Sequence, residues 1–266
     1  MKENSLEITK YIQIARKKHR EGNIYQANEI YKNLINQKNY TYDLLISYGL
    51  FCKEINNLKI AKNLFFLSIK KYPLKINSYI LLAEILRKEN NINDAFKTLY
   101  AAKKIEKFNS EIDYNLSIVF KTIQLFKEAI LSIDSAINQK PDNQKYQILK
   151  ADILIELAKN EDAKELLLNL KLPNESVLFF QRQILFSKIF INQMKFGLAE
   201  KVLLDLRKSF SKERILYLNL SDLYFKNKAL EKGILILKEG IQLFPNFIPL
   251  RFNLAVMYRN CLLYTS

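Results

Sequence analysis

Apolar residues recur at helical spacing in two successive stretches of residues 76–109. The first stripe comprises Tyr79, Leu82, Ala83 and Leu86, and the second comprises Ile92, Ala95, Leu99 and Ala102. Residues spaced three, four and seven apart lie on one face of an α-helix. Because the polar run 89–91 separates the two stripes, the segment is predicted to form a helix, a short turn and a second helix.

The same pattern recurs along the chain with a period of 34 residues, and two columns of small residues keep step with it. A small residue allows two helices to cross at close range, where a larger side chain would hold the backbones apart. The column of the second helix contains Ala27, Ala61, Ala95, Ala129, Ala163, Ala199 and Gly233, and that of the first helix contains Ala15, Gly49, Ala83, Ser117, Ala151, Ser187, Ser221 and Ala255.

These columns resemble the signature of the tetratricopeptide repeat family, in which Leu or an aromatic residue, Leu, Gly or Ala, Tyr, Ala, Phe, Ala and Pro follow in order. The second repeat reads Leu45, Tyr48, Gly49, Cys52, Ala61, Phe65, Ser68 and Pro73. The resemblance implies an all-α fold, a right-handed α-solenoid of antiparallel helix pairs that bury a continuous core by stacking. It divides a single domain, residues 1–260, into repeats at about 8–41, 42–75, 76–109, 110–143, 144–179, 180–213 and 214–247, with a partial eighth at 248–260.

The chain departs from this signature at a few places. The fifth repeat carries two extra residues around 172–174, so we expect the weakest packing at residues 171–176. Residues 261–266 resemble the translation of a sequencing-library adaptor, which predicts an artefactual tail and a natural chain that continues; a genuine short tail is the alternative. Polar residues replace apolar ones and are expected to weaken the packing locally at Lys18, Asp113, Gln147, Lys150 and Gln183.

The composition excludes several other classes of protein. Gly and Pro number only 5 each, too few for the turns of a sandwich, a barrel or a doubly wound sheet. Hydrophobic residues at 49% exclude a disordered tail, and charged residues at 26% exclude a membrane bundle. No signal segment or bilayer-spanning window is present, so we expect a cytoplasmic protein with no membrane partner. Cys52 and Cys261 are far apart in sequence and do not have the spacing of metal ligands. Neither a disulfide framework nor a zinc site is therefore predicted.

The net charge of +15, from 42 basic and 27 acidic residues, suits an anionic partner. However, Lys, Asn and Ile are abundant together while Arg is scarce, as expected for a bacterial genome rich in A and T. Much of the excess Lys is therefore expected to be solvated surface. The chain also has a single histidine, His19, and scattered glycines that form no phosphate-binding loop. We predict no catalytic constellation, no cofactor and no metal for this chain.

The resemblance to tetratricopeptide repeats implies a peptide groove lined by the first helix of each repeat. Position five of that helix is apolar, and it either forms a floor for the peptide or supports the core; its candidates are Ile80, Tyr114, Ile148, Ile184 and Leu218. Position twelve holds His19, Lys53, Arg87 and Lys121 in the first four repeats and Ile155, Ile191 and Phe225 in the next three, with Arg16 beside the basic half.

The predicted groove is cationic in its amino-terminal half and apolar in its carboxy-terminal half, which suits a protein or peptide with an acidic segment. The alternative is that the basic column is solvated surface. Exposed charge pairs contribute only about 0.2–1 kcal/mol each. Apolar anchors such as Tyr114, Ile155 and Phe225 are therefore expected to provide most of the affinity.

Two functions fit these observations. The first is a non-enzymatic protein-interaction scaffold that binds a partner peptide in its concave groove. The second is the substrate-recruiting region of a larger enzyme, a glycosyl- or sulfotransferase or an oxygenase, whose catalytic domain follows this segment. Nucleic acid is the least favoured partner, because the basic residues are not expected to be interleaved with the exposed aromatic side chains that stack bases.

Overall fold

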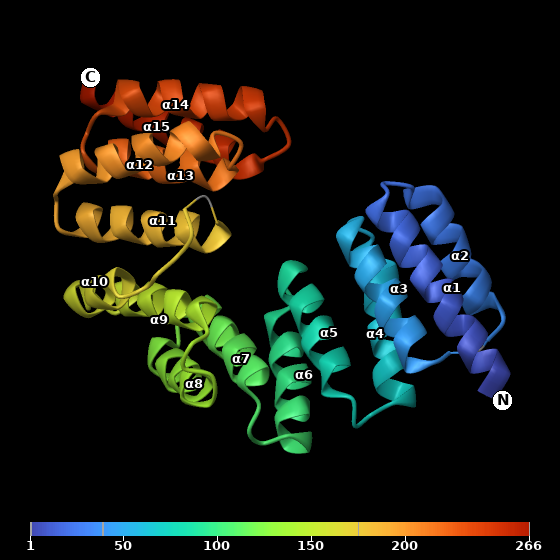
Figure 1. Ribbon diagram of the computed structural model, residues 1–266. Coiled ribbons are helices and arrows are strands. Elements are labelled where there is room, and N and C mark those ends of the chain that lie inside the picture. The colour runs from blue at the N-terminus through green and yellow to red at the C-terminus, as the bar shows by residue number, and fades with distance from the viewer. Residues whose placement is uncertain (1, 39, 175, 266) are drawn as a thin grey trace. The chain divides into compact units, whose positions relative to one another are not determined.

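The computed structural model describes residues 2–38, 40–174 and 176–265, with side chains from residue 6 to residue 261 within these ranges. The described residues form fifteen α-helices and no strand (Figure 1). The first eight helices are α1 (Lys2–Arg20), α2 (Ile24–Asn36), α3 (Tyr42–Glu54), α4 (Leu58–Lys71), α5 (Ile76–Lys88), α6 (Ile92–Ile105), α7 (Ser110–Thr122) and α8 (Phe126–Gln139). The others are α9 (Gln144–Glu156), α10 (Asn160–Leu168), α11 (Val177–Asn192), α12 (Phe196–Phe210), α13 (Arg214–Lys226), α14 (Leu230–Leu243) and α15 (Ile248–Thr265).

The chain divides into two compact units, residues 1–139 (unit 1, α1–α8) and residues 140–266 (unit 2, α9–α15). In each unit the helices form antiparallel pairs, and the second helix of one pair packs on the first helix of the next, as α4 does on α5 and α12 on α13. First helices of successive pairs also contact each other, for example α5 and α7, or α11 and α13. The all-α class and the helix pairs predicted from the sequence are confirmed, whereas the single domain over residues 1–260 stays a prediction.

Asparagine side chains cap the N-termini of the second helices in the first three pairs. Asn23, Asn57 and Asn91 each accept a hydrogen bond from the backbone N–H three residues later, at 3.3, 3.3 and 3.4 Å. Such a cap satisfies one of the N–H groups that have no partner inside the helix. In later pairs α10, α12 and α14 begin at the equivalent position without a side-chain cap, so the cap supports the helix start in these three pairs but is not required for it.

A residue in the left-handed conformation follows the first helix of every pair. In the first pair this residue is Gly22, with a φ of 79°. At the equivalent position the later pairs have φ values between 58° and 61°, in Asn56, Asn90, Gln124, Ala158, Met194 and Lys228. Most side chains other than those of glycine and asparagine are strained there, so the helix pair imposes this turn even on residues such as Ala158 and Met194.

The two columns of small residues lie inside the helix stack. The alanines of the second-helix column are fully buried from Ala27 to Ala199. In the first-helix column, a Cβ atom on Gly49 would lie only 2.3 Å from Cε1 of the Phe65 ring. The crossing of α3 and α4 at this point is therefore too close for any side chain at residue 49.

The insertion in the fifth repeat coincides with a shortened helix. α10 has nine residues, whereas α4, α6, α8 and α14 have fourteen. A non-helical segment then leads to Val177, three residues before the predicted start of the sixth repeat, and its residue Glu175 lies outside the described residues. The weaker packing expected at 171–176 stays a prediction.

At the end of the chain, α15 continues through Thr265. The segment predicted to be an artefactual tail is thus helical up to that residue, and Ser266 lies outside the described residues. Among the described helices, none combines the length and the apolar character that crossing a bilayer requires.

Candidate functional site

The predicted basic residues of unit 1 form a column at the ends of four first helices. His19, Lys53, Arg87 and Lys121, here called the cationic column, are each the last residue but one of α1, α3, α5 and α7. The carbonyl end of a helix carries a partial negative charge that favours cations. The repeat thus places one basic side chain at the same end of each first helix, and all four lie within unit 1.

Contacts between neighbouring repeats fix several of these side chains. The Arg16 guanidinium donates a hydrogen bond of 2.6 Å to the hydroxyl of Ser47, on α3. His19 Nδ1 lies 3.3 Å from a carboxylate oxygen of Glu54, and Lys53 pairs with Glu84, on α5. The structure therefore brings these residues together as a series, but their acidic neighbours offset part of the positive charge.

Arg87 is the exception within the cationic column. Its Nε atom is buried and has no hydrogen-bond partner among the described residues. Burial lowers the pKa of the Arg87 guanidinium, and the nearby Glu84 carboxylate and Tyr114 hydroxyl partly offset this shift. The charge on Arg87 is thus poorly solvated and only partly compensated.

A hollow of about 370 Å³ opens beside Arg87 and is lined by Lys53, Glu84, Arg87 and Lys88. Its lining thus carries three basic side chains and one carboxylate, and Lys53 is paired with that carboxylate. The sequence prediction included Lys53 and Arg87 but missed Glu84. The available signal was its spacing, because Glu84 follows Lys53 by 31 residues, almost one repeat.

Most of the predicted apolar floor lies in the core. Ile80, Ile148 and Ile184 are buried, whereas Tyr114 and Leu218 are partly exposed. Of the two interpretations of position five, packing in the core is therefore the one that fits the three isoleucines. Only the partly exposed members offer surface to a ligand.

The apolar half of position twelve divides in the same way. Ile155 and Ile191 are buried, while the Phe225 side chain is 39% exposed. Phe225 lines a hollow of about 720 Å³ in unit 2 together with Leu230 and the three lysines Lys226, Lys228 and Lys232. Phe225 is thus the member of this group that can contact a partner.

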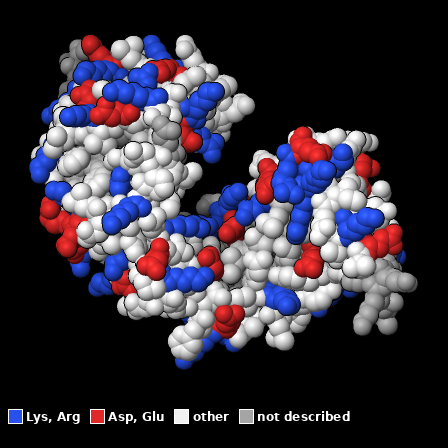
Figure 2. Space-filling view, viewed as in Figure 1, with Lys and Arg blue, Asp and Glu red and all other residues white. Residues whose placement is uncertain are grey.

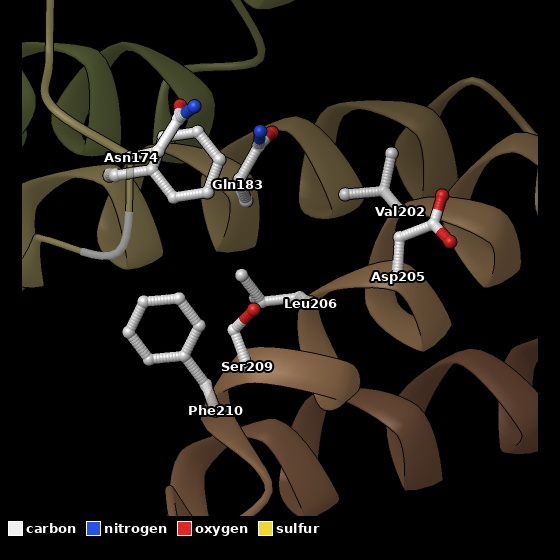
Figure 3. Close-up of a pocket in the computed structure, with 8 residues that line it drawn as sticks. Asn174, Gln183, Val202, Asp205, Leu206, Ser209 and Phe210 are labelled. Carbon is white, nitrogen blue, oxygen red and sulfur yellow. The ribbon is translucent and has the colours of Figure 1, made fainter.

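A further pocket, not expected from the sequence, lies between α11 and α12. It has a volume of about 370 Å³. Figure 3 shows Asn174 and Gln183 on one side and Ser209 and Phe210 on the other, with Leu206 between them. Asn174 belongs to the segment that follows the short α10, so the insertion contributes to the wall of this pocket.

Charge is distributed unevenly over the visible face of the protein. Figure 2 shows Lys and Arg side chains on both units with Asp and Glu among them, whereas the area over α11 is largely uncharged. Within the residues that the structure describes, no group of three or more His, Cys, Asp or Glu side chains is arranged to hold a metal ion.

Solved structures with a similar fold are known. A chain in the APC/C hetero-tetramer Cut9-Hcn1 matches with a TM-score of 0.72 and 13% identity, over 91% of this chain and 48% of that one, so this chain spans about half its length. A tetratricopeptide repeat protein from Parabacteroides merdae matches with a TM-score of 0.55 and 15% identity, over 82% and 98% of the two chains. Pseudomonas aeruginosa pilF matches with a TM-score of 0.60 and 13% identity, over 77% and 92%. No protein-family model and no curated protein matches the sequence. The chain thus has the helical-repeat fold of tetratricopeptide repeat proteins.

Proposed function

We propose that this chain is a protein-interaction scaffold that binds an acidic, extended segment of a partner along the first helices of unit 1. Stacked helix pairs of this fold present the same helix face once per repeat, which suits an extended polypeptide. The cationic column supplies one basic side chain at the equivalent position of each first helix in unit 1.

The hollow beside Arg87 carries the proposal. A carboxylate of the partner that enters it would meet Lys53, Arg87 and Lys88. The Arg87 guanidinium, whose charge is buried and only partly compensated by Glu84 and Tyr114, would gain a negatively charged partner. Hydrogen bonds between two charged groups are shorter and stronger than those between neutral groups, so this is where an acidic side chain would be held best.

Apolar contacts are needed in addition to charge. Exposed ion pairs contribute about 0.2–1 kcal/mol each, which is too little for four basic residues to hold a peptide tightly. Tyr114 is partly exposed and lies near Arg87, so it is the apolar anchor that we propose in unit 1. In unit 2, taken by itself, Ile155 and Ile191 are buried and Phe225 is 39% exposed, so of these three only Phe225 offers an apolar surface there.

The test uses a fluorescent synthetic peptide that alternates Asp and Glu with Leu and Phe, titrated with the full chain. The triple variant Lys53→Glu, Arg87→Glu, Lys121→Glu should abolish binding. A control variant with the same change of net charge, Lys127→Glu, Lys201→Glu, Lys212→Glu, alters exposed lysines away from the cationic column and should bind as the wild type does. Because Arg87→Glu places a second carboxylate beside Glu84, Arg87→Gln serves as a milder variant, and it should also weaken binding. Unchanged binding by the triple variant would refute the proposal.

A further inference from the structure

A second basic surface of unit 1 lies on the second helices of two consecutive pairs. α4 carries Lys59, Lys62, Lys70 and Lys71 and no acidic residue, and α6 carries three lysines and one aspartate. The second helix α10 of unit 2 has the opposite balance, with three acidic residues and one lysine. The general abundance of lysine therefore does not explain the local excess on α4 and α6.

Exposed apolar side chains alternate with these lysines at intervals of four residues. Phe66, Lys70 and Leu74 follow one another along α4 and its turn, and Tyr100, Lys104 and Phe108 do so along α6 and its turn. Both helices begin and end 34 residues apart, so the two sets occupy equivalent positions of consecutive repeats. Equivalent positions point to the same side of a stack of repeats. These six residues are here called the lysine-aromatic surface.

The three aromatic side chains of this surface are each more than half exposed. The side chains of Phe66, Tyr100 and Phe108 are 64%, 52% and 74% exposed. Lys104 Nζ lies 5.2 Å from the centroid of the Tyr100 ring. Neither Lys70 nor Lys104 forms an ion pair within the described residues. The expectation that no exposed aromatic side chains are interleaved with the basic residues is therefore wrong for α4 and α6.

We propose that the lysine-aromatic surface binds single-stranded nucleic acid. Unpaired bases stack on exposed aromatic rings whatever their sequence, and lysines bind the phosphates between them. The order of ring, cation and ring in Tyr100, Lys104 and Phe108 resembles the alternation of base and phosphate along a strand, and the equivalent set on α4 has Leu74 in place of the second ring. A membrane fits less well, because a helix that lies in the bilayer interface needs a continuous apolar face, and one lysine interrupts the row of apolar side chains on each helix, Lys70 on α4 and Lys104 on α6.

The test measures the fluorescence anisotropy of labelled oligothymidylate and oligouridylate of about 16 nucleotides with the full chain. The triple variant Phe66→Ala, Tyr100→Ala, Phe108→Ala should bind at least about tenfold more weakly. Leu168→Ala is the matched control, because Leu168 is exposed and occupies the repeat position of Phe66 and Tyr100 in unit 2, and it should leave binding unchanged. In the double variant Lys70→Gln, Lys104→Gln, the logarithm of the binding constant should depend less steeply on the logarithm of the salt concentration. The magnitude of this slope should fall by about 1.4, since each phosphate contact on a single strand contributes about 0.7.

Three outcomes would overturn the proposal. One is binding of neither oligonucleotide by the wild type. Another is binding of vesicles containing phosphatidylserine, lost in the aromatic variant, without binding of oligonucleotides. A third is equal loss of oligonucleotide binding in the variant of Lys53, Arg87 and Lys121, which would indicate a general effect of net charge. The proposal is independent of peptide binding at the cationic column, and that variant separates the two.

Discussion

The carboxylate of Asp113 accepts a hydrogen bond of 2.7 Å from the hydroxyl of Ser135, which joins the two helices of the α7–α8 pair. Gln139 donates a second bond of 2.9 Å to the same oxygen, and Lys103 pairs with the other. Asp113 is only 2% exposed. A position that the sequence predicted to be a local weakness is thus a buried charge with three partners.

Replacement of Asp113 with alanine should lower the free energy of unfolding by about 3 kcal/mol, because it leaves the partners of a buried carboxylate without an acceptor. Asp113→Asn can still accept from Ser135 but loses the charge opposite Lys103, so its loss should be intermediate. Urea denaturation followed by circular dichroism measures both. A loss below about 0.5 kcal/mol for the alanine variant, the range of ordinary surface substitutions, would show that the network contributes little.

Strain at the turn position predicts that a glycine stabilises the chain. Ala158 has a φ of 60°, so Ala158→Gly should raise the free energy of unfolding by about 0.5–1 kcal/mol after the added flexibility of the unfolded chain is deducted. Gly22→Ala should lower it by a similar amount. Asn90 occupies the same position, and since asparagine tolerates this conformation, Asn90→Gly should change stability less than Ala158→Gly does. Thermal unfolding of the three variants provides the comparison, and a destabilised Ala158→Gly chain would contradict it.

The close approach of Gly49 to Phe65 predicts a specific rescue. Gly49→Ala should cost about 1–3 kcal/mol, because the added methyl group overlaps the Phe65 ring. The next repeat combines Ala83 with the smaller Leu99 at these two positions, so Gly49→Ala with Phe65→Leu should recover part of the loss. A double-mutant cycle measures the coupling between the two sites. If the losses of stability were strictly additive, the side chains at positions 49 and 65 would not interact with each other.

The segment between α10 and α11 should be the first site of proteolysis. It is non-helical from Leu170 to Asn174, and Leu168 and Val177 on either side are exposed. Limited trypsin digestion should therefore cut at Lys171 before it cuts at Lys75 and Lys107, which lie in regular turns and serve as internal controls. Mass spectrometry of the early fragments identifies the first cut. Cutting at the same rate at all three lysines would contradict the predicted weakness.

Local pattern was enough to predict the helices. The alanines that recur with Ala61 mark the buried crossing of each pair, and polar residues such as Asn57 mark the turns. Both signals lie within one repeat, so they could be read without tertiary information. The resemblance to tetratricopeptide repeats added the helix pairing that the structure confirms.

Features that depend on contacts between repeats could not be predicted in this way. The partners of Asp113 come from two other helices, α6 and α8, and Glu84 pairs with Lys53 across a repeat boundary. Burial of Ile155 and Ile191 also depends on neighbouring helices, because the same residue type at the same position is a groove residue only if nothing covers it. The exposure of Phe66 and Tyr100 likewise depends on the neighbouring helices, because hydrophobicity alone does not distinguish a core residue from an exposed one.

Hydrogen exchange with and without the acidic peptide tests the proposed scaffold function most directly. Saturating peptide should slow the exchange of backbone amides in the last turns of α1, α3, α5 and α7, where the cationic column lies, and should leave α4 and α6 unchanged. Protection confined to the second helices, or no protection at a peptide concentration that saturates binding, would contradict it.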